Sequence, residues 1–427
     1  MLVARLAAGA VALTACQSGG VADRTHHGAA VHVVGSWGGE EEAGFKAMVK
    51  PFEDRTGITV VYEGTRDLDS VLNRRIQEGD PPELAAVNGL PALKRFAQSG
   101  KLIDLDGVLD MKAMHKQYSA PWLRLAQVAG GAYAIFLKAS LEGQVWYATK
   151  QSTAAGLSPS RPPASLEDLM AIADGIKARG ATPWCIGLES GVASGWPGTD
   201  WLEDIVLRQS GPQLYEDWLN GRLAWTSPEI KRAWQTWGQI VADPAMVFGG
   251  KSGMLSTNFQ VAGNPLFTSP PGCYLHHQGA FIASIFTQSD PGLKMSDFNF
   301  FMFPDIAPQF SGAAEVKGDL LGMFKDTPAA RQLIRYLASA PAQEIWVRRA
   351  ALSVNRMVPA SAYPSAISRE EGRVLATARI VEFDASDNMP DAMRAEFERD
   401  VLAFVANPSA LGSLLDRLDR VRVAAYR

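Results

Sequence analysis

Residues 245–252, AMVFGGKS, are the first candidate for chemistry, because they match a permissive form of the phosphate-binding P-loop. A working P-loop follows a hydrophobic strand and opens a helix, so that its backbone amides cradle phosphates. Here Pro244 stands directly before the motif and breaks any strand that would lead into it. We therefore do not expect this segment to bind a nucleotide.

Two pairs of adjacent histidines, His26-His27 and His276-His277, are the second candidate. Neighbouring side chains diverge in a strand or a helix, and the chain has no HExxH spacing that would place two imidazoles on one metal ion. A serine nucleophile elbow of the G-x-S-x-G type is also absent. These patterns predict no metal site, no cofactor and no serine-hydrolase chemistry.

Cys16 ends a segment that is typical of an export signal. Residues 1–15 place one positive charge, Arg5, before about ten apolar residues, which suits a secretory signal and is too short to span a bilayer. Residues 13–16, LTAC, resemble the lipobox of bacterial lipoproteins, so we predict a signal peptide over 1–15 and a diacylglycerol on Cys16. Residues 16–30 then form a flexible tether to the outer face of the membrane. The alternative is an ordinary signal peptide with an incidental cysteine.

Export changes the expectation for the other two cysteines, Cys185 and Cys273. An even pair in an oxidising compartment favours a disulfide, and we predict that these two are bonded to each other. Two separate buried thiols are the alternative.

Composition excludes several classes of protein. The 427 residues are 47% hydrophobic, and 41 basic against 45 acidic residues give a net charge of −4. A faintly acidic chain lacks the basic face that a nucleic-acid-binding protein needs. A hydrophobic content this high rules out global disorder and is ample for more than one core.

The elements that must position any site follow from hydrophobic periodicity. Residues 31–34 and 58–62 are apolar strands, and between them Phe45, Met48, Val49 and Phe52 repeat at helical spacing. Strand, helix and strand at this spacing predict a βαβ unit and a parallel sheet. Further helices are expected at 68–78, from Ser165 to Gly180 behind a capping box, and at 390–406, with strands at 83–87 and 319–324.

The order of these elements predicts an α/β protein with two lobes. We assign 31–139 plus 304–356 to lobe I and 140–303 plus 357–427 to lobe II. The runs 136–145 and 299–305, with a further run near 354–359, are expected to cross between the lobes. Such crossing segments restrict relative motion to bending about a hinge.

Several segments resemble the bacterial extracellular solute-binding proteins of carbohydrate importers, in particular the α-glucoside-binding branch. They are GSWGGEEEAGFKAMVKPFEDRTGITVVY, GKLIDLD, QVWYATK, GWPGTDWLEDIVLRQSGP, HHQGAF, VKGDLLGMFKDTPAARQLIRYLASAPAQEIW, SVNRMVPASAYP and FDASDNMP. The resemblance covers about 30–427. It implies a type II periplasmic-binding-protein fold, the two-lobed clamp, which holds a sugar between its lobes and delivers it to an ABC transporter permease. A monomer is expected.

Sugars present hydroxyls and apolar C–H faces, so their sites need aromatic platforms and charged hydrogen-bonding groups. In lobe I these groups should follow strand ends, where open α/β sheets bind ligands. The candidates are Trp37, Gly38, Glu40, Arg66, Asp67 and Asn88. The opposing candidates in the second lobe are Trp196, Asp200 and Trp201 on a loop rich in Gly and Pro, and His277 and Gln278 as neutral hydrogen-bonding partners. Two further candidates are Asp319 on the returning chain and Asp387 in a second acidic loop.

Each candidate also has an ordinary structural explanation. Trp37, Trp196 and Trp201 are the best stacking residues because glycines bracket them, whereas Trp218, Trp225, Trp234 and Trp237 are expected in the core. Asp200 could cap a helix, and Asp387 could be a turn residue. Carboxylates and tryptophans in a cleft would also describe a glycosidase, which is the rival class. A polyol phosphate is a less favoured ligand, because the candidate loops carry no evident cluster of Arg and Lys.

Overall fold

A computed structural model describes residues 28–158 and 161–427. The predicted signal peptide, Cys16, His26-His27 and most of the predicted tether lie outside these residues. Within the described part of the chain, no helix is both long enough and apolar enough to span a membrane.

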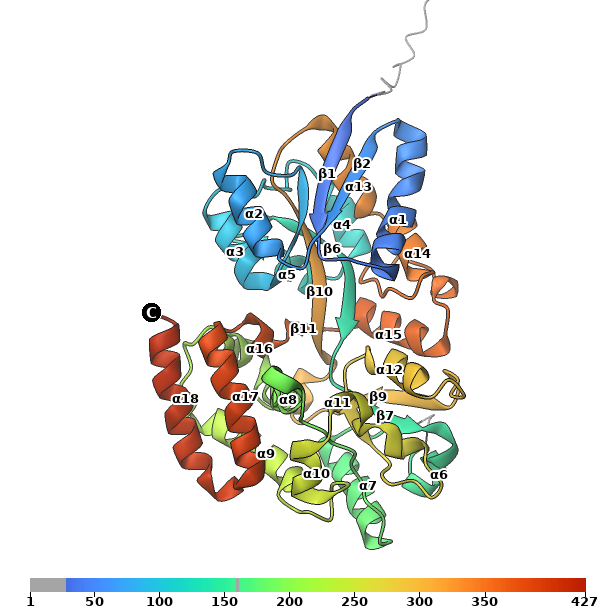
Figure 1. Cartoon of the computed structure of the whole chain (residues 1–427), viewed down its shortest axis with the longest axis vertical. Helices are drawn as coiled ribbons and strands as arrows, with labels where there is room; N and C mark the ends of the chain where they lie inside the picture. The colour runs from blue at the N-terminus through green and yellow to red at the C-terminus, as the bar shows by residue number, and fades with distance from the viewer. Residues whose placement is uncertain (1–27, 159–160) are drawn as a thin grey trace, which may run out of the picture.

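The first lobe is built on the predicted parallel unit. Strand β1 (Ala30–Gly35) pairs in parallel with β2 (Thr59–Gly64) and β3 (Leu84–Val87), and α1 (Glu40–Thr56) connects the first two. The apolar stripe of α1 is buried, and Gly57 ends the helix at a left-handed φ of 69°. The βαβ prediction is confirmed. Helices α2 (Leu68–Gln77), α3 (Gly89–Gln98), α4 (Met111–Gln117), α5 (Ala120–Leu125), α13 (Pro328–Leu337) and α14 (Ala340–Val347) complete this body (Figure 1).

Two long antiparallel strands, β6 (Ala134–Leu141) and β10 (Ala313–Met323), run between the lobes (Figure 1). The end of β10 pairs with β3, whereas its beginning pairs with β11 (Ile380–Phe383), so the sheet order is β11-β10-β3-β1-β2. The predicted crossing at 299–305 is wrong in part. Residues Phe298–Met302 form β9, which pairs with β7 in the second lobe, and the chain returns through β10 instead.

The second lobe contains an antiparallel sheet of order β8-β7-β9, with β7 at Gln144–Ala148 and β8 at His276–Gln278. Helix α7 (Leu166–Ala178) begins at the predicted capping box of Ser165 and Asp168. The larger helices are α8 (Trp196–Leu219), α9 (Pro228–Val241), α17 (Asp391–Ala406) and α18 (Leu411–Ala425). Short helices are α6 (Ser152–Ala155), α10 (Gly250–Ser256), α11 (Phe259–Ala262), α12 (Ile282–Ser289) and α16 (Ala385–Asn388), and α15 (Ala366–Thr377) lies beside the hinge strands.

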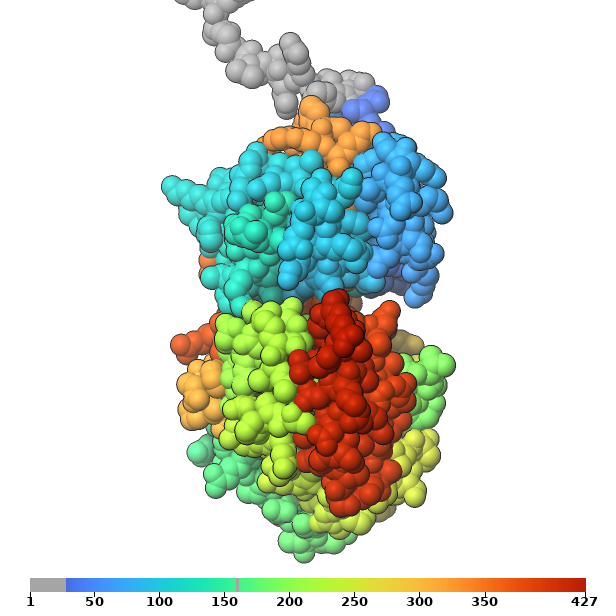
Figure 2. Space-filling model, turned by 90° about the vertical axis from the view of Figure 1, so that its left-hand side faces the viewer, coloured from blue at the N-terminus to red at the C-terminus, as the bar shows by residue number. Residues whose placement is uncertain are grey.

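The apolar residues form two large cores, one in each lobe, and the molecule narrows between them (Figure 2). The four tryptophans expected in the core are buried in the second one. Val358, Tyr363 and Leu375 pack into the first core, which therefore extends beyond residue 356, the end of the predicted lobe I segment.

Cys185 and Cys273 are bonded to each other, with their Cα atoms 5.5 Å apart, which confirms the predicted disulfide. The bond lies in a third, smaller apolar cluster with Trp146, Leu266 and Phe286. It fixes the segment that precedes α8 to the segment that leads into β8.

Candidate functional site

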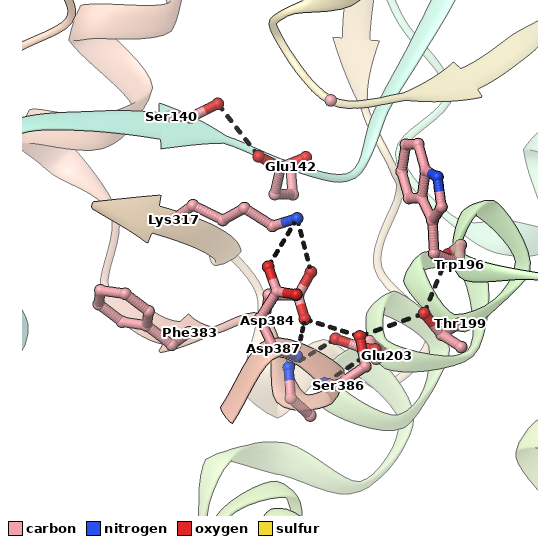
Figure 3. Close-up of polar contacts among 12 residues, drawn as sticks. Ser140, Glu142, Trp196, Thr199, Glu203, Lys317, Phe383, Asp384, Ser386 and Asp387 are labelled. Atoms are coloured by element: carbon pink, nitrogen blue, oxygen red, sulfur yellow. Dashed lines mark hydrogen bonds and ion pairs between the residues drawn. The ribbon is translucent and has the colours of Figure 1, made fainter. Parts of the chain in front are cut away.

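Lys317 on β10 is the centre of a charged cluster between the hinge and the second lobe (Figure 3). Its Nζ lies 3.1 Å from Asp384 Oδ2 and 3.0 Å from Asp387 Oδ2. The same ammonium lies 5.8 Å from the centre of the Trp196 ring, close enough for a cation–π contact. The side chains of Trp196 and Asp387 are both partly exposed, so a ligand can reach each of them.

Glu142, in the segment that joins β6 to β7, faces the same lysine (Figure 3). Burial raises the pKa of its carboxyl to about 7, against the opposing effects of Lys317 and of a hydrogen bond donated by Ser140 at 3.0 Å. A Cβ atom at residue 279 would overlap the Glu142 carboxylate, which explains the glycine in HHQGAF.

Asp384 and Glu203 anchor the short helix α16. Asp384 accepts hydrogen bonds from Asp387 N at 2.9 Å and Ser386 Oγ at 3.0 Å, and Glu203 accepts from Ala385 N at 2.6 Å. Burial alone would raise the pKa of Asp384, but Lys317 and the hydrogen bond from Asp387 N lower it below its usual value. The carboxylate of Asp384 therefore stays charged and holds Lys317 in place.

Asp204 takes part in a separate buried network. Its carboxylate contacts the Arg208 guanidinium, and its Oδ2 lies 2.8 Å from His277 Nε2. Arg208 also donates from Nε to Phe303 O at 2.9 Å and from Nη2 to Ala313 O at 3.1 Å. Trp201 stacks on the His277 ring at 4.3 Å. These contacts use His277 and Trp201 to support the lobe rather than to line a cleft.

The lobe I candidates separate into buried and exposed residues. Trp37 is 1% exposed among Phe45, Tyr62 and Trp346, and its Nε1 donates to Asp319 Oδ2 at 2.6 Å. Asp319 in turn lies 3.2 Å from Lys138 Nζ. The exposed candidates are Gly38, Arg66, Asp67 and Asn88 in the loops after β1, β2 and β3, and Glu40 at the start of α1.

Among the candidates in the second lobe, Trp196 and Asp387 are accessible to solvent, whereas Asp200, Trp201, His277 and Gln278 are buried. Neither Trp37 nor Trp201 offers a free face in this conformation, because other aromatic rings or His277 cover it. Asp200 is not a helix cap, since Gly195 is the N-cap residue of α8 and no side chain caps that helix.

Lys317, Glu142 and Asp384 were not among the candidates named from the sequence, although Lys317 and Asp384 belong to the quoted segments that contain VKGDLL and FDASDNMP. A lone lysine inside a strand gives no local signal of this kind. Only the pairing of β10 with both β6 and β11 brings these three side chains together.

A cavity of about 580 Å³ lies between the lobes beside β6. Its first-lobe lining includes Glu40, Glu41, Lys138 and Trp346, and its second-lobe lining includes Phe281 and Ser284. Ser140 also lines it and connects it to the charged cluster through its bond to Glu142. A cavity of this size, formed by both lobes and lined mainly by apolar groups with a few polar ones, fits a small-molecule site.

Glu371 on α15 provides a test of the electrostatics near the hinge. Burial raises its pKa from 4.5 to about 7, and a hydrogen bond donated by Gln144 opposes this effect. The folded protein therefore keeps a proton that the unfolded chain loses, so stability falls as pH rises from about 4.5 to about 7. We expect Glu371→Gln to raise the free energy of unfolding at about pH 8 by up to about 3 kcal/mol and to have little effect near pH 4.

Urea denaturation of both proteins across this pH range measures the difference. Glu370→Gln is the matched control, because Glu370 is exposed and pairs with Arg373 on the same helix. If the free energy of unfolding of Glu371→Gln depends on pH in the same way as that of the wild type, Glu371 is ionised in the folded protein at neutral pH.

Two lobes, strands that cross between them and an accessible polar site at their junction define a solute-binding protein. The sequence model of the bacterial extracellular solute-binding protein family matches residues 47–366. The chain belongs to this family, and it therefore acts outside the cytoplasm.

Two relatives match most of the chain. The osmoprotective compounds-binding protein GgtB of Synechocystis sp. is 36% identical over 387 residues, which cover 90% of each protein. The alpha-glucosides-binding periplasmic protein AglE of Rhizobium meliloti is 32% identical over 393 residues, which cover 90% of this chain and 85% of AglE. Both are binding proteins. The bacterial solute receptor AcbH shares the fold, with a TM-score of 0.81 at 18% identity over 93% of this chain and all of AcbH.

Proposed function

We propose that the protein is the substrate-binding component of an ABC-type importer and that it captures an uncharged sugar, an α-glucoside or oligosaccharide, between its lobes. The observation that carries this proposal is the accessible Trp196 beside the Lys317–Asp387 ion pair, where strand β10 meets α8 and α16 of the second lobe. The name of the relative AglE, an alpha-glucosides-binding protein, supports this ligand class.

The chemistry of these groups suits a sugar. The indole of Trp196 offers an apolar face to C–H groups, and Asp387 and Lys317 offer an acceptor and a donor to hydroxyls. The acidic surroundings of Lys317, including Glu142, Asp384 and Asp387, disfavour an anionic ligand such as a polyol phosphate. A neutral polyhydroxylated ligand needs no compensating charge.

Calorimetric titration with maltose, sucrose and trehalose tests the proposal. We expect at least one of these α-glucosides to bind, and we expect Trp196→Ala and Asp387→Asn each to raise its Kd about tenfold or more, the equivalent of about 1.4 kcal/mol. Asp391→Asn is the matched control, because Asp391 is a neighbouring exposed acid that pairs with Arg394 at the surface. Equal affinity of all four proteins would exclude this surface as the sugar site.

The same complexes test the clamp mechanism and the rival enzyme. A sugar that contacts both lobes favours the closed state, so the radius of gyration from X-ray scattering should fall on binding. We propose that the protein binds without converting its ligand, so chromatography should recover the sugar unchanged. Release of a shorter sugar by the pure protein would instead indicate a glycosidase.

We also propose that a diacylglycerol on Cys16 anchors the protein to the membrane and holds it near its permease. The support is the LTAC segment at 13–16. Two acyl chains give stable anchoring, so Cys16→Ser should move the exported protein from the membrane fraction to the soluble fraction. Continued sedimentation of that variant with membranes free of permease would contradict the lipid anchor.

A further inference from the structure

Three buried carboxylates from separate parts of the chain converge behind Lys317. Asp200 on α8, Glu315 on β10 and Asp384 before α16 each offer an oxygen, and these atoms all lie within 4.8 Å of one another. The three residues are 2%, 0% and 1% exposed, respectively. Carboxylates this close and this deeply buried require compensation for their charge.

Asp200 and Glu315 lack that compensation among the described residues. Within 28–158 and 161–427, Asp200 Oδ2 and both carboxylate oxygens of Glu315 accept no hydrogen bond except for the contact of Glu315 with the neighbouring Glu203 carboxyl, and neither Asp200 nor Glu315 forms an ion pair. Their acidic neighbours differ. Glu203 accepts from two backbone amides of α16, and Asp204 contacts both Arg208 and His277. Three of the unsatisfied buried oxygens therefore lie where the three carboxylates meet, and a further one belongs to Glu142, which faces Lys317.

Lys317 neutralises only part of the negative charge of these carboxylates. Its ion pairs reach Asp384 and Asp387, on the side that faces Trp196. Adding one divalent cation to Asp200, Glu315 and Asp384 would reduce their combined charge from −3 to −1, beside the positive charge of Lys317. All the available ligand atoms are carboxylate oxygens, and none of the three residues offers nitrogen or sulfur. Oxygen-only ligands select hard cations over zinc or copper.

We propose that Asp200, Glu315 and Asp384 bind a hard divalent cation, Ca²⁺ or Mg²⁺, with water completing its coordination. The ion would join α8, β10 and the start of α16 at one point. It would also brace Asp384, which holds Lys317, and Asp200, which lies one helical turn after Trp196 on α8. The cation site would therefore support the surface formed by Trp196 and Lys317, and its existence does not depend on which sugar binds there.

Calorimetry of EDTA-dialysed protein at neutral pH, with CaCl₂ and MgCl₂ as separate titrants and no sugar present, tests the site. We expect one ion per chain with a Kd of about 1 mM or tighter for at least one of the two cations. Glu315→Gln keeps the size of the side chain but removes its charge, and should weaken that binding at least tenfold. Asp200→Asn should do the same. Glu371→Gln, a buried glutamate away from the cluster, should bind as the wild type does.

Failure of both cations to bind wild-type protein at about 10 mM would overturn the proposal and would indicate that the carboxyl groups share protons instead. Wild-type affinity in Glu315→Gln and Asp200→Asn would place the ion elsewhere and would also overturn it. Melting curves in EDTA show that each variant is folded before it is titrated. If neither variant folds, terbium luminescence is the deciding measurement. Tb³⁺ should bind wild-type protein and Glu371→Gln alike, and added Ca²⁺ or Mg²⁺ should displace it from both. The absence of a terbium signal would contradict the site.

Discussion

Arg208→Met should lower the free energy of unfolding by about 3–5 kcal/mol, because it removes one partner of a buried ion pair. The guanidinium of Arg208 is 1% exposed and is held by Asp204 and by the carbonyl oxygens of Phe303 and Ala313. Methionine fills a similar volume but donates no hydrogen bond. The variant would leave the Asp204 carboxylate buried with His277 as its remaining hydrogen-bonding partner.

Chemical denaturation followed by tryptophan fluorescence measures this loss. Arg222→Met is the matched control, since Arg222 pairs with Asp217 at the surface and such pairs contribute about 1 kcal/mol or less. Adding Asp204→Asn to Arg208→Met should restore part of the stability, because it removes the charge that was left unpaired. A loss below about 1 kcal/mol in Arg208→Met would show that the network adds little to folding.

Removing the disulfide should have an effect of similar size. Cys185 and Cys273 are separated by 88 residues in sequence, and a loop of that length is worth about 4–5 kcal/mol in the chain-entropy model. Both residues are buried beside Trp146 and Phe286, so alanine is the gentlest replacement. We expect Cys185→Ala/Cys273→Ala to unfold at a clearly lower denaturant concentration than the wild type.

Dithiothreitol provides the control for this prediction. It should lower the stability of the wild type to about that of the double variant. The stability of the double variant itself should not change, because only the wild type has a disulfide to reduce. Equal stability of wild type and double variant under oxidising conditions would mean that the bond constrains the unfolded chain less than the entropy model requires.

Local patterns in the sequence were enough for the secondary structure around the first site loop. The stripe of Phe45, Met48 and Phe52 and the flanking apolar runs predicted α1 between β1 and β2, because helical and extended periodicities differ within a few residues. Ser165 and Asp168 predicted the start of α7 for the same reason, since a capping box is contained in one turn. The disulfide followed from counting cysteines once export was inferred.

Only the tertiary structure decided which tryptophans are buried and which are exposed to solvent. Trp37 and Trp196 both follow or precede glycine, and nothing nearby in sequence separates them. Trp37 is covered by Tyr62 and by Trp346, which is distant in the chain, whereas Trp196 remains partly exposed beside Lys317. Exposure depends on which distant residues pack against a side chain, and periodicity carries no information about those partners.

The charged cluster has the same origin. Glu142, Asp200, Glu315 and Asp384 are ordinary acidic residues in their local sequence, and they meet because β10 pairs with β6 on one side and β11 on the other while α8 packs beneath them. The sequence by itself was enough to predict the main helices and strands, the family resemblance and the disulfide, because each of these depends on short patterns or on a count of residues. The pairing of distant strands decided which charges became buried together, and electrostatic energy depends on those distances and on that burial rather than on the order of residues along the chain.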